Sequence, residues 1–280
     1  MCDARRGSAP TLNRRRLVRL GGAGAAVVAG FSIGSAGRGL ARADDATPGA
    51  AEPDAHWTYE GEEGPEHWGE LDPDYASCSG GTQQSPIDVS EATGADIANI
   101  EFSYQPVSPL HIINNGHTLQ VNIPEGSSIT LDGATYPLKQ FHFHAPSEHT
   151  VDGRAEAMEL HLVHITDDGT IAVVGVLLAE GEGNQALAAV FEAMPAMAGS
   201  EQEVTGSVDL AALLPEQRTT YRYMGSLTTP PCSEGVHWLL MTEASSVGPP
   251  QVEAFRTVFG ADARPVRPLN DRTVTEDTSA

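Results

Sequence analysis

The 280-residue chain is strongly acidic, with 38 Asp and Glu residues against 16 Lys and Arg and a formal net charge of −22. Nucleic acid repels such a polyanion, which excludes it as a partner. Because 40% of the residues are hydrophobic, the chain can bury a packed core, and disorder throughout is excluded as well.

The first 43 residues differ from the rest and predict an export signal of the twin-arginine type. They hold eight arginines and a single acid, Asp3. The pattern Asn13-Arg14-Arg15-Arg16-Leu17-Val18 precedes a weakly apolar stretch that ends in Ala41-Arg42-Ala43, a cleavage pattern. A transmembrane anchor is the alternative, but many glycines and Arg38 interrupt the stretch. We therefore expect a signal peptide over residues 1–43, a periplasmic or extracellular mature protein, and no membrane association after cleavage.

The remaining chain reads as one domain. Residues 44–55 are rich in Ala, Pro, Asp and Glu and predict a flexible acidic leader. Between residues 56 and 272 no linker-like composition and no internal repeat interrupts the sequence. The polar residues 273–280 predict a disordered tail.

Hydrophobic periodicity predicts more strand than helix. Alternating apolar and polar residues predict strands over residues 119–123, 138–144, 159–165 and 237–242. The apolar run 171–178 predicts a strand buried on both faces. Apolar residues at 3–4 spacing predict a helix over 184–194, and a proline start predicts another over 249–259. The expected fold class is α+β, a single domain on a large, mostly antiparallel central sheet with a few short peripheral helices.

The number and positions of the three cysteines are consistent with export. Cys2 leaves with the signal, so that Cys78 and Cys232 remain. An even pair in an exported protein predicts one disulfide bond, and two free buried thiols are the alternative.

Histidines on two predicted strands suggest a metal centre. Side chains alternate along a strand, so His142 and His144 share one face. The second strand offers His161 or His164 on opposite faces, and Glu159 shares the face of His161, which favours His161. Three neutral imidazoles suit Zn²⁺ and leave its fourth position for water, as in a catalytic site. Ordinary surface or core histidines are the alternative interpretation.

Motifs along the whole predicted domain resemble those of the α-class carbonic anhydrases. In chain order they are His56-Trp57-Thr58-Tyr59, Gly64-Pro65-Glu66-His67-Trp68, Gln84-Ser85-Pro86-Ile87-Asp88, Asn114-Asn115-Gly116-His117, Gln140-Phe141-His142-Phe143-His144, Ser147-Glu148-His149, Glu159-Leu160-His161-Leu162-Val163-His164, Ser226-Leu227-Thr228-Thr229-Pro230-Pro231-Cys232 and Arg264-Pro265-Val266-Arg267-Pro268-Leu269-Asn270. They stand in the family's order and cover essentially all of residues 56–272.

The resemblance implies a zinc lyase, a carbonic anhydrase or carbonate dehydratase. His142, His144 and His161 would hold Zn²⁺, and zinc-bound hydroxide would reversibly hydrate CO₂ to bicarbonate and a proton. Ester hydrolysis is an expected secondary activity, and a homodimer is an expected assembly because dimers are common among bacterial members. A catalytically silent binding module and a dedicated zinc esterase are the alternatives.

The resemblance also implies roles around the metal. Gln140 and Glu159 would accept the free N–H groups of His142 and His161, and the main chain of Asp262 would orient His144. Asp262 stands where the family often has asparagine, so its carboxylate is a departure.

For the substrate, the resemblance assigns Thr228 as the hydroxyl that orients the attacking oxygen by donating to Glu148. Thr229 would contact bicarbonate. The apolar wall for CO₂ would consist of Val163, Val173, Leu227, Val236 and Trp238.

For the proton, the resemblance assigns His117 as the shuttle between the metal site and solvent. The side chains expected around the connecting waters are Tyr59, Asn115 and Gln120.

Overall fold

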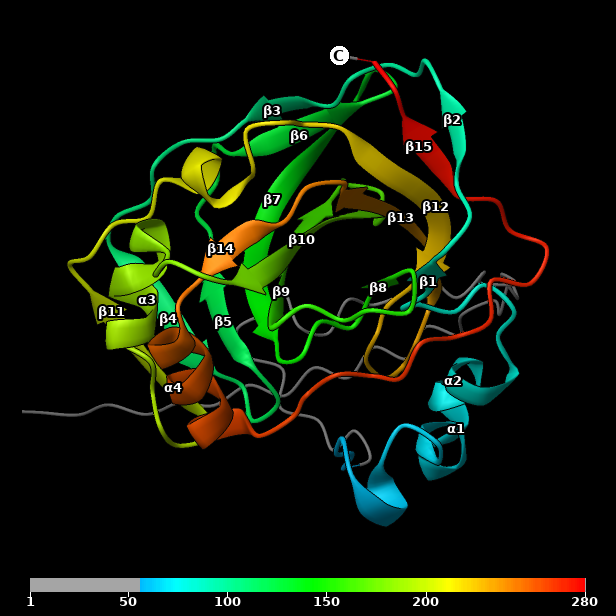
Figure 1. Cartoon of the computed structure of the whole chain (residues 1–280). Helices are drawn as coiled ribbons and strands as arrows, with labels where there is room; N and C mark the ends of the chain where they lie inside the picture. The colour runs from blue at the N-terminus through cyan, green and yellow to red at the C-terminus, as the bar shows by residue number, and fades with distance from the viewer. Residues whose placement is uncertain (1–55, 280) are drawn as a thin grey trace, which may run out of the picture. The chain divides into compact units, whose positions relative to one another are not determined.

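The computed structural model describes residues 56–279, and the predicted signal and leader, residues 1–55, lie outside this range. Its main feature is a sheet of 13 strands with the principal order β11-β4-β5-β7-β9-β10-β13-β12-β15-β2 (Figure 1). The strands are β2 (Thr93–Ala95), β3 (Glu101–Ser103), β4 (Leu110–Asn114), β5 (Leu119–Asn122), β6 (Ser128–Leu131), β7 (Ala134–His144), β9 (Met158–Ile165), β10 (Ile171–Glu180), β11 (Ser200–Val204), β12 (Thr220–Ser226), β13 (Glu234–Met241), β14 (Ser245–Val247) and β15 (Thr275–Asp277).

Most neighbouring strands run antiparallel, as predicted, but the sheet is mixed. Strand β10 pairs in parallel with β13 and with β14, and β15 pairs in parallel with β2. A separate two-stranded parallel sheet joins β1 (Asp88–Val89) to β8 (Thr150–Val151). All five predicted strands are present, and β10 is buried along most of its length because both of its faces are covered.

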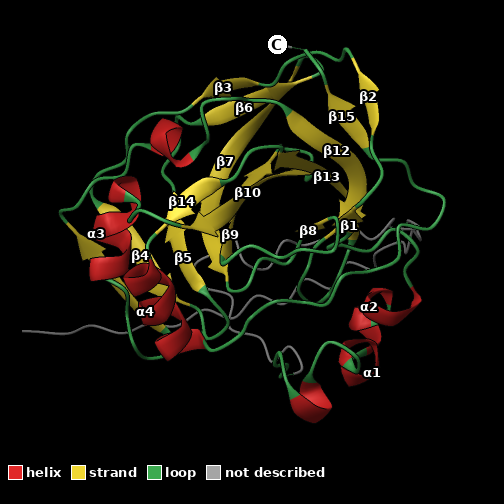
Figure 2. Ribbon diagram, in the orientation of Figure 1, coloured by secondary structure: helices red, strands yellow, loops and turns green. Residues whose placement is uncertain are grey.

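The helices are short and peripheral. They are α1 (Trp68–Leu71), α2 (Ser77–Gly80), α3 (Ala188–Glu192) and α4 (Pro249–Phe259), with 3₁₀ helices at Gly61–Glu63, Pro73–Tyr75, Gln185–Leu187 and Leu210–Leu213. Figure 2 shows α3 and α4 together at one side of the sheet and α1 and α2 together at another.

One helix matches its prediction and one is shorter. Helix α4 spans the predicted range, with prolines in its first turn. The helix predicted over 184–194 divides into a 3₁₀ turn and α3, because the side chain of Asn184 accepts a hydrogen bond from the N–H of Ala186 and begins a tight turn.

The predicted disordered tail is wrong for residues 275–277. They form β15, which pairs with β12 and β2 through main-chain groups. The carboxylate of Asp277 lies 2.9 Å from the guanidinium of Arg222 and is buried, so polar side chains here belong to a strand.

Two apolar clusters lie on opposite faces of the central strands. Phe141 and Phe143 of β7 belong to the larger cluster. Val163 of β9 and Trp238 of β13 belong to the smaller one. Because alternate residues of a strand point to opposite faces, His142 and His144, which alternate with these phenylalanines, lie on the side of the smaller cluster.

Candidate metal centre

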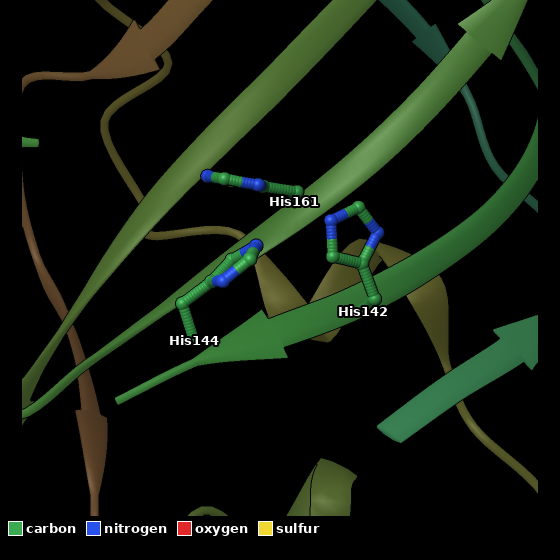
Figure 3. Close-up of side chains that lie close together, drawn as sticks. All are labelled: His142, His144 and His161. Atoms are coloured by element: carbon green, nitrogen blue, oxygen red, sulfur yellow. The ribbon is translucent and has the colours of Figure 1, made fainter. Parts of the chain in front are cut away.

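Three histidines from two adjacent strands converge on one point. His142 and His144 lie on β7, and His161 is the cross-strand partner of His142 on β9. One ring nitrogen from each lies within 4.8 Å of the others, and Figure 3 shows the three rings gathered over the sheet. The structure therefore brings the three predicted ligands together.

Each ring uses its other nitrogen for a protein partner. The pairs are His142 Nδ1 with Gln140 Oε1 at 2.9 Å, His144 Nδ1 with the main-chain oxygen of Asp262 at 2.7 Å, and His161 Nε2 with Glu159 Oε1 at 2.9 Å. These contacts select the tautomer and leave His142 Nε2, His144 Nε2 and His161 Nδ1 as donor atoms.

One of these donor atoms is left unsatisfied by the protein. His144 Nε2 is buried and has no hydrogen-bond partner among the described residues; the nearest carboxylate oxygen, of Glu148, is 3.5 Å away. Buried polar atoms in native structures almost always have a partner. A metal ion bound by the three imidazoles would supply it, so the residues fit Zn²⁺.

Glu159 serves as a hydrogen-bond hub beside this cluster. Its carboxylate accepts from the N–H groups of Glu148 and His149 and from the rings of His149 and His161. Burial alone would raise the pKa of Glu159, but the two imidazoles outweigh burial and hold this pKa well below its usual range. Since its oxygens are taken, we interpret Glu159 as a group that positions His161.

His164 lies on the opposite face of β9, as strand alternation predicted. Its ring contacts the hydroxyl of Tyr104 at 2.9 Å through Nε2 and the main-chain oxygen of Ala172 at 3.3 Å through Nδ1. Both nitrogens are occupied, so His164 is a structural histidine.

Glu148 and Thr228 are both buried, and Glu148 Oε2 lies 3.5 Å from His144 Nε2. Burial raises the pKa of Glu148 to about 8, and hydrogen bonds from the Thr228 hydroxyl and the N–H of Arg264 offset this rise only in part. The N–H of Arg264 lies 2.9 Å from Glu148 Oε1. Sequence reasoning gave no role to Arg264, because a main-chain donor leaves no signature in the residue type.

Asp262 contributes both its main chain and its side chain. Its Oδ1 accepts the N–H of Ala145 at 2.7 Å, while Oδ2 lies 3.9 Å from His144 Nδ1. Burial raises the pKa of this carboxyl to about 7. The main-chain contact with His144 agrees with the expectation, and the side chain holds the loop after β7.

The predicted apolar wall is a continuous cluster. Val163, Val173, Val236 and Trp238 are at most 6% exposed, and Leu227 packs against them. Val173 pairs with Val163 on one side and with Trp238 on the other, so the wall crosses three strands on the face that carries the histidines.

His117 lies flat against Trp57. The ring centroids are 3.6 Å apart and the planes differ by 7°. Burial lowers the pKa of His117 to about 4, and nearby His56 adds to this effect. Tyr59 packs edge-on against Trp57, and the Asn115 side chain accepts the N–H of His117. The stacking role of Trp57 was missed, since no spacing pattern relates it to a residue 60 positions later.

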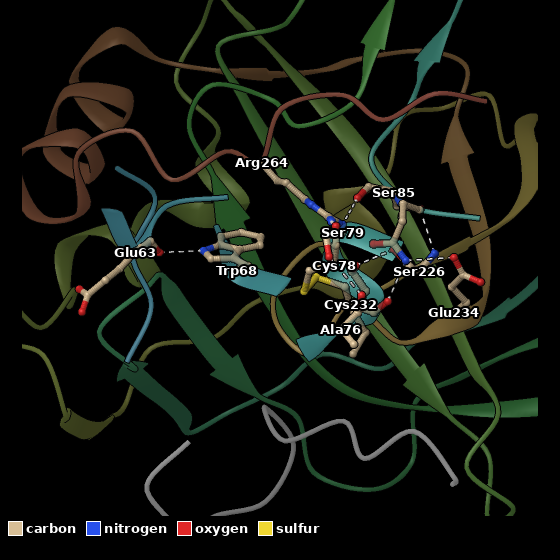
Figure 4. The surroundings of a disulfide bond; sticks show 12 residues. Glu63, Trp68, Ala76, Cys78, Ser79, Ser85, Ser226, Cys232, Glu234 and Arg264 are labelled. Carbon is tan, nitrogen blue, oxygen red and sulfur yellow. Dashed lines mark hydrogen bonds between the residues drawn. A yellow bond between two sulfur atoms is a disulfide. The ribbon is translucent and has the colours of Figure 1, made fainter. Parts of the chain in front are cut away.

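The predicted disulfide bond between Cys78 and Cys232 is present (Figure 4). It joins the segment of α2 to the loop that carries Thr228 and Thr229, and the N–H of Cys232 donates to the main-chain oxygen of Thr229. The Arg264 guanidinium donates to the main-chain oxygen of Cys78, so the disulfide and Glu148 share one neighbour.

Within residues 56–279, none of the helices has the length and apolar character needed to span a lipid bilayer.

Comparisons with known proteins agree with the site. A family model described as "Eukaryotic-type carbonic anhydrase" matches residues 63–278. A carbonic anhydrase from Nostoc sp. is 42% identical over 272 residues, which are 95% of this chain and 98% of that protein. One from Pectobacterium carotovorum is 41% identical over 220 residues, or 78% and 90% of the two chains.

Solved structures give the same result. The α-carbonic anhydrase of Thermovibrio ammonificans, in complex with the inhibitor sulfanilamide, is 46% identical with a TM-score of 0.77, and the match covers 79% of this chain and 99% of that one. With its fold, its three-histidine cluster and these relatives in agreement, the chain belongs to the eukaryotic-type, or α, carbonic anhydrase family.

Proposed function

We propose that this protein reversibly hydrates CO₂ to bicarbonate and a proton, using one Zn²⁺ held by His142, His144 and His161. The observation that carries the proposal is the convergence of three imidazole nitrogens whose ring partners are already satisfied. When bound there, Zn²⁺ supplies a Lewis acid that lets a water molecule ionise near neutral pH.

The histidines are prepared to bind the ion. Burial lowers the pKa of His142 well below its usual value and that of His161 to about 4, so protons do not compete for these rings at neutral pH. Gln140, Glu159 and the main chain of Asp262 hold the rings in the orientation that points their free nitrogens at one position.

Thr228 would orient the reacting oxygen. A hydroxyl has a single proton, and the Thr228 hydroxyl, which lowers the pKa of Glu148, would donate that proton to the Glu148 carboxylate. It can therefore only accept a hydrogen bond from a group in the site, which selects a protonated oxygen and sets its direction. Thr229, the next residue, would contact the bicarbonate product.

The substrate CO₂ carries no net charge and needs an apolar surface. We assign it to the wall formed by Val163, Val173, Leu227, Val236 and Trp238.

His117 would carry the proton from the site to solvent. In the stack on Trp57 its pKa is about 4, which is too low for it to hold a proton at neutral pH. The ring would therefore accept a proton only after leaving Trp57 and regaining water. Tyr59, Asn115 and Gln120 would hold the waters between.

We also propose that the protein is exported and works as a homodimer. The disulfide Cys78–Cys232 supports export, because such bonds persist in oxidising compartments. Mass spectrometry of the secreted or periplasmic fraction should find a chain that begins near Asp44, and size-exclusion chromatography with light scattering should give twice the monomer mass.

The central test is zinc analysis coupled to stopped-flow CO₂ hydration. We expect one zinc per chain, hydration lost after chelation and restored by added zinc, and ester hydrolysis that follows the same dependence at a lower rate. A zinc-loaded protein without CO₂ hydration would reject the proposal, and ester hydrolysis as the faster reaction would favour a zinc esterase.

A further inference from the structure

A row of hydrogen-bonded side chains runs from the surface of β11 toward the loop of His117. Its members all lie on the sheet face that carries the three histidines, since Asn122 pairs with His111 and with Gln140, and Gln120 pairs with Ile113 and with His142. The links are Asn115 Nδ2 to Gln120 Oε1 at 3.4 Å, Gln120 Nε2 to Asn122 Oδ1 at 2.7 Å, Asn122 Nδ2 to His111 Nδ1 at 3.4 Å, and His111 Nε2 to Glu201 Oε2 at 3.2 Å.

Every link in this row points in the same direction. Each amide donates through nitrogen toward the surface and accepts through oxygen from the side of the loop. An amide has two distinct ends, so one that turns over must break or reverse the link on each side.

The inner end of the row cannot turn over. The Oδ1 atom of Asn115 accepts from the main-chain N–H groups of His117 and Thr118, both at 2.9 Å. A reversed Asn115 would place its NH₂ group against two donors. Asn115 therefore always donates to Gln120.

The outer end of the row is His111, whose imidazole can carry one or two protons. To accept from Asn122, His111 must lack a proton on Nδ1, and it then donates from Nε2 to Glu201. Its side chain is 35% exposed. The charged groups that face it are Glu201 and its cross-strand partner Glu203 on β11, whereas β5 presents the neutral Asn122 and Gln120.

We propose that His111, paired with Glu201, is a positioning residue whose protonation state decides whether the amide row from Asn122 to Asn115 is continuous. When His111 is neutral, every donor in the row faces an acceptor. A second proton on His111 turns Nδ1 into a donor, so Asn122 must either lose this bond or reverse and face Gln120 Nε2 with its own NH₂ group. One hydrogen bond of the row is broken in either case.

The proposal deepens the proposed function, on which its catalytic part rests. Gln120 and Asn115 border the path assigned to the shuttled proton. A broken hydrogen bond in the row would therefore change the rate of proton transfer to solvent, and the rate of the hydration step itself would stay the same. The expected effect is on kcat, which includes proton transfer, and not on kcat/KM.

Nuclear magnetic resonance tests the row without using activity. In the zinc-loaded protein, the side-chain amide resonances of Asn122 and Gln120 should shift with pH at the midpoint of the His111 imidazole. In His111→Gln the shifts should vanish, because glutamine can accept from Asn122 and donate to Glu201 at every pH. If the side-chain amide resonances of Asn122 did not shift as His111 gained its second proton, the proposal would be overturned.

Kinetics with two variants test the coupling. His111→Lys has donors only, so it should lower kcat by about three- to tenfold at pH 8, the size that one hydrogen bond allows, with kcat/KM within about twofold. Its kcat relative to wild type should rise toward one as the pH falls, while that of His111→Gln should stay near one at pH 8 and rise above one in acid.

Ratios that do not change with pH would overturn the coupling. Absence of CO₂ hydration from wild type and both variants alike would instead reject the proposed function, and the resonance titration would still decide whether the row exists.

Discussion

Strand β9 carries two buried histidines three residues apart, and their surroundings differ in one respect. His161 is 1% exposed and His164 is 0% exposed, so burial does not distinguish them. His164 has a protein partner for each ring nitrogen, Tyr104 and Ala172. His161 has a partner, Glu159, for one nitrogen and directs the other toward His142 and His144.

This difference separates a structural histidine from a candidate metal ligand. A buried imidazole nitrogen without a partner costs free energy, so a fold that leaves His144 Nε2 buried and, within residues 56–279, unpartnered beside the free nitrogens of His142 and His161 must recover the cost from something that it binds. The number of nitrogens left without a protein partner is therefore more informative than burial or the residue type.

The largest expected effect is on the metal side of this comparison. In His161→Ala one of three ligands is lost, so zinc should leave the protein and CO₂ hydration should fall by at least about a thousandfold. Zinc analysis after dialysis and stopped-flow assays measure both.

The matched control lies on the same strand. His164→Gln should keep one zinc per chain and most of the activity, because it points to the other face. If the two variants lost zinc equally, the distinction drawn between the faces of β9 would be wrong.

Next in size is the loss of a partner that orients a ligand. Gln140→Leu leaves the Nδ1–H of His142 without an acceptor, so zinc affinity should fall by about 10- to 100-fold. Competition with a chelator measures this change. An unchanged affinity would mean that His142 does not depend on Gln140 for its orientation.

The burial of His164, the structural histidine of this comparison, can be tested by lowering the pH. Burial lowers the pKa of His164 to about 3, whereas the unfolded chain protonates histidine near 6.5. The unfolded state therefore binds more protons as the pH falls below 6.5, and stability is lost through the window down to about pH 3. For this residue the loss between pH 7 and pH 5 is about 2 kcal/mol.

His164→Gln should remove that loss. The free energy of unfolding, measured by denaturant titration at both pH values, should fall by about 2 kcal/mol less in the variant than in wild type. His142 and His161 are present in both proteins, so their own titration cancels. An equal acid loss would contradict a proton-free, buried His164.

The smallest effect is expected at the partner of His164. Tyr104→Phe removes only the hydroxyl and leaves Nε2 of the ring without a hydrogen bond, which should cost about 1 to 2 kcal/mol of stability. Zinc content should not change. Loss of zinc in this variant would show that the two faces of the sheet are coupled.

The sequence predicted the parts of the site that lie on single strands. Alternation placed His142 and His144 on one face, and Glu159 two residues before His161 favoured it over His164. In the structure His142, His144 and His161 lie together, and His164 contacts Tyr104 and Ala172 on the other face. The same reasoning predicted the strands and α4, since these depend on local periodicity.

Contacts between distant segments could not be derived in this way. The main-chain oxygen of Asp262 reaches His144 across 118 positions, and only the family resemblance pointed to it. The stack of His117 on Trp57 and the donor role of the Arg264 N–H gave no signal at all. The polar residues 273–280 predict a disordered tail, although residues 275–277 form β15. This strand pairs through main-chain groups, and the residue types give no sign of such pairing.

The disulfide bond has a consequence for the integrity of the chain. Cys78 and Cys232 are 154 positions apart, and the exposed turns at 167–169 and 181–183 lie between them. A protease cut in either turn would leave both fragments covalently joined. Proteolytic damage at these turns would then not release a fragment, and the nicked molecule would run as one species until it is reduced.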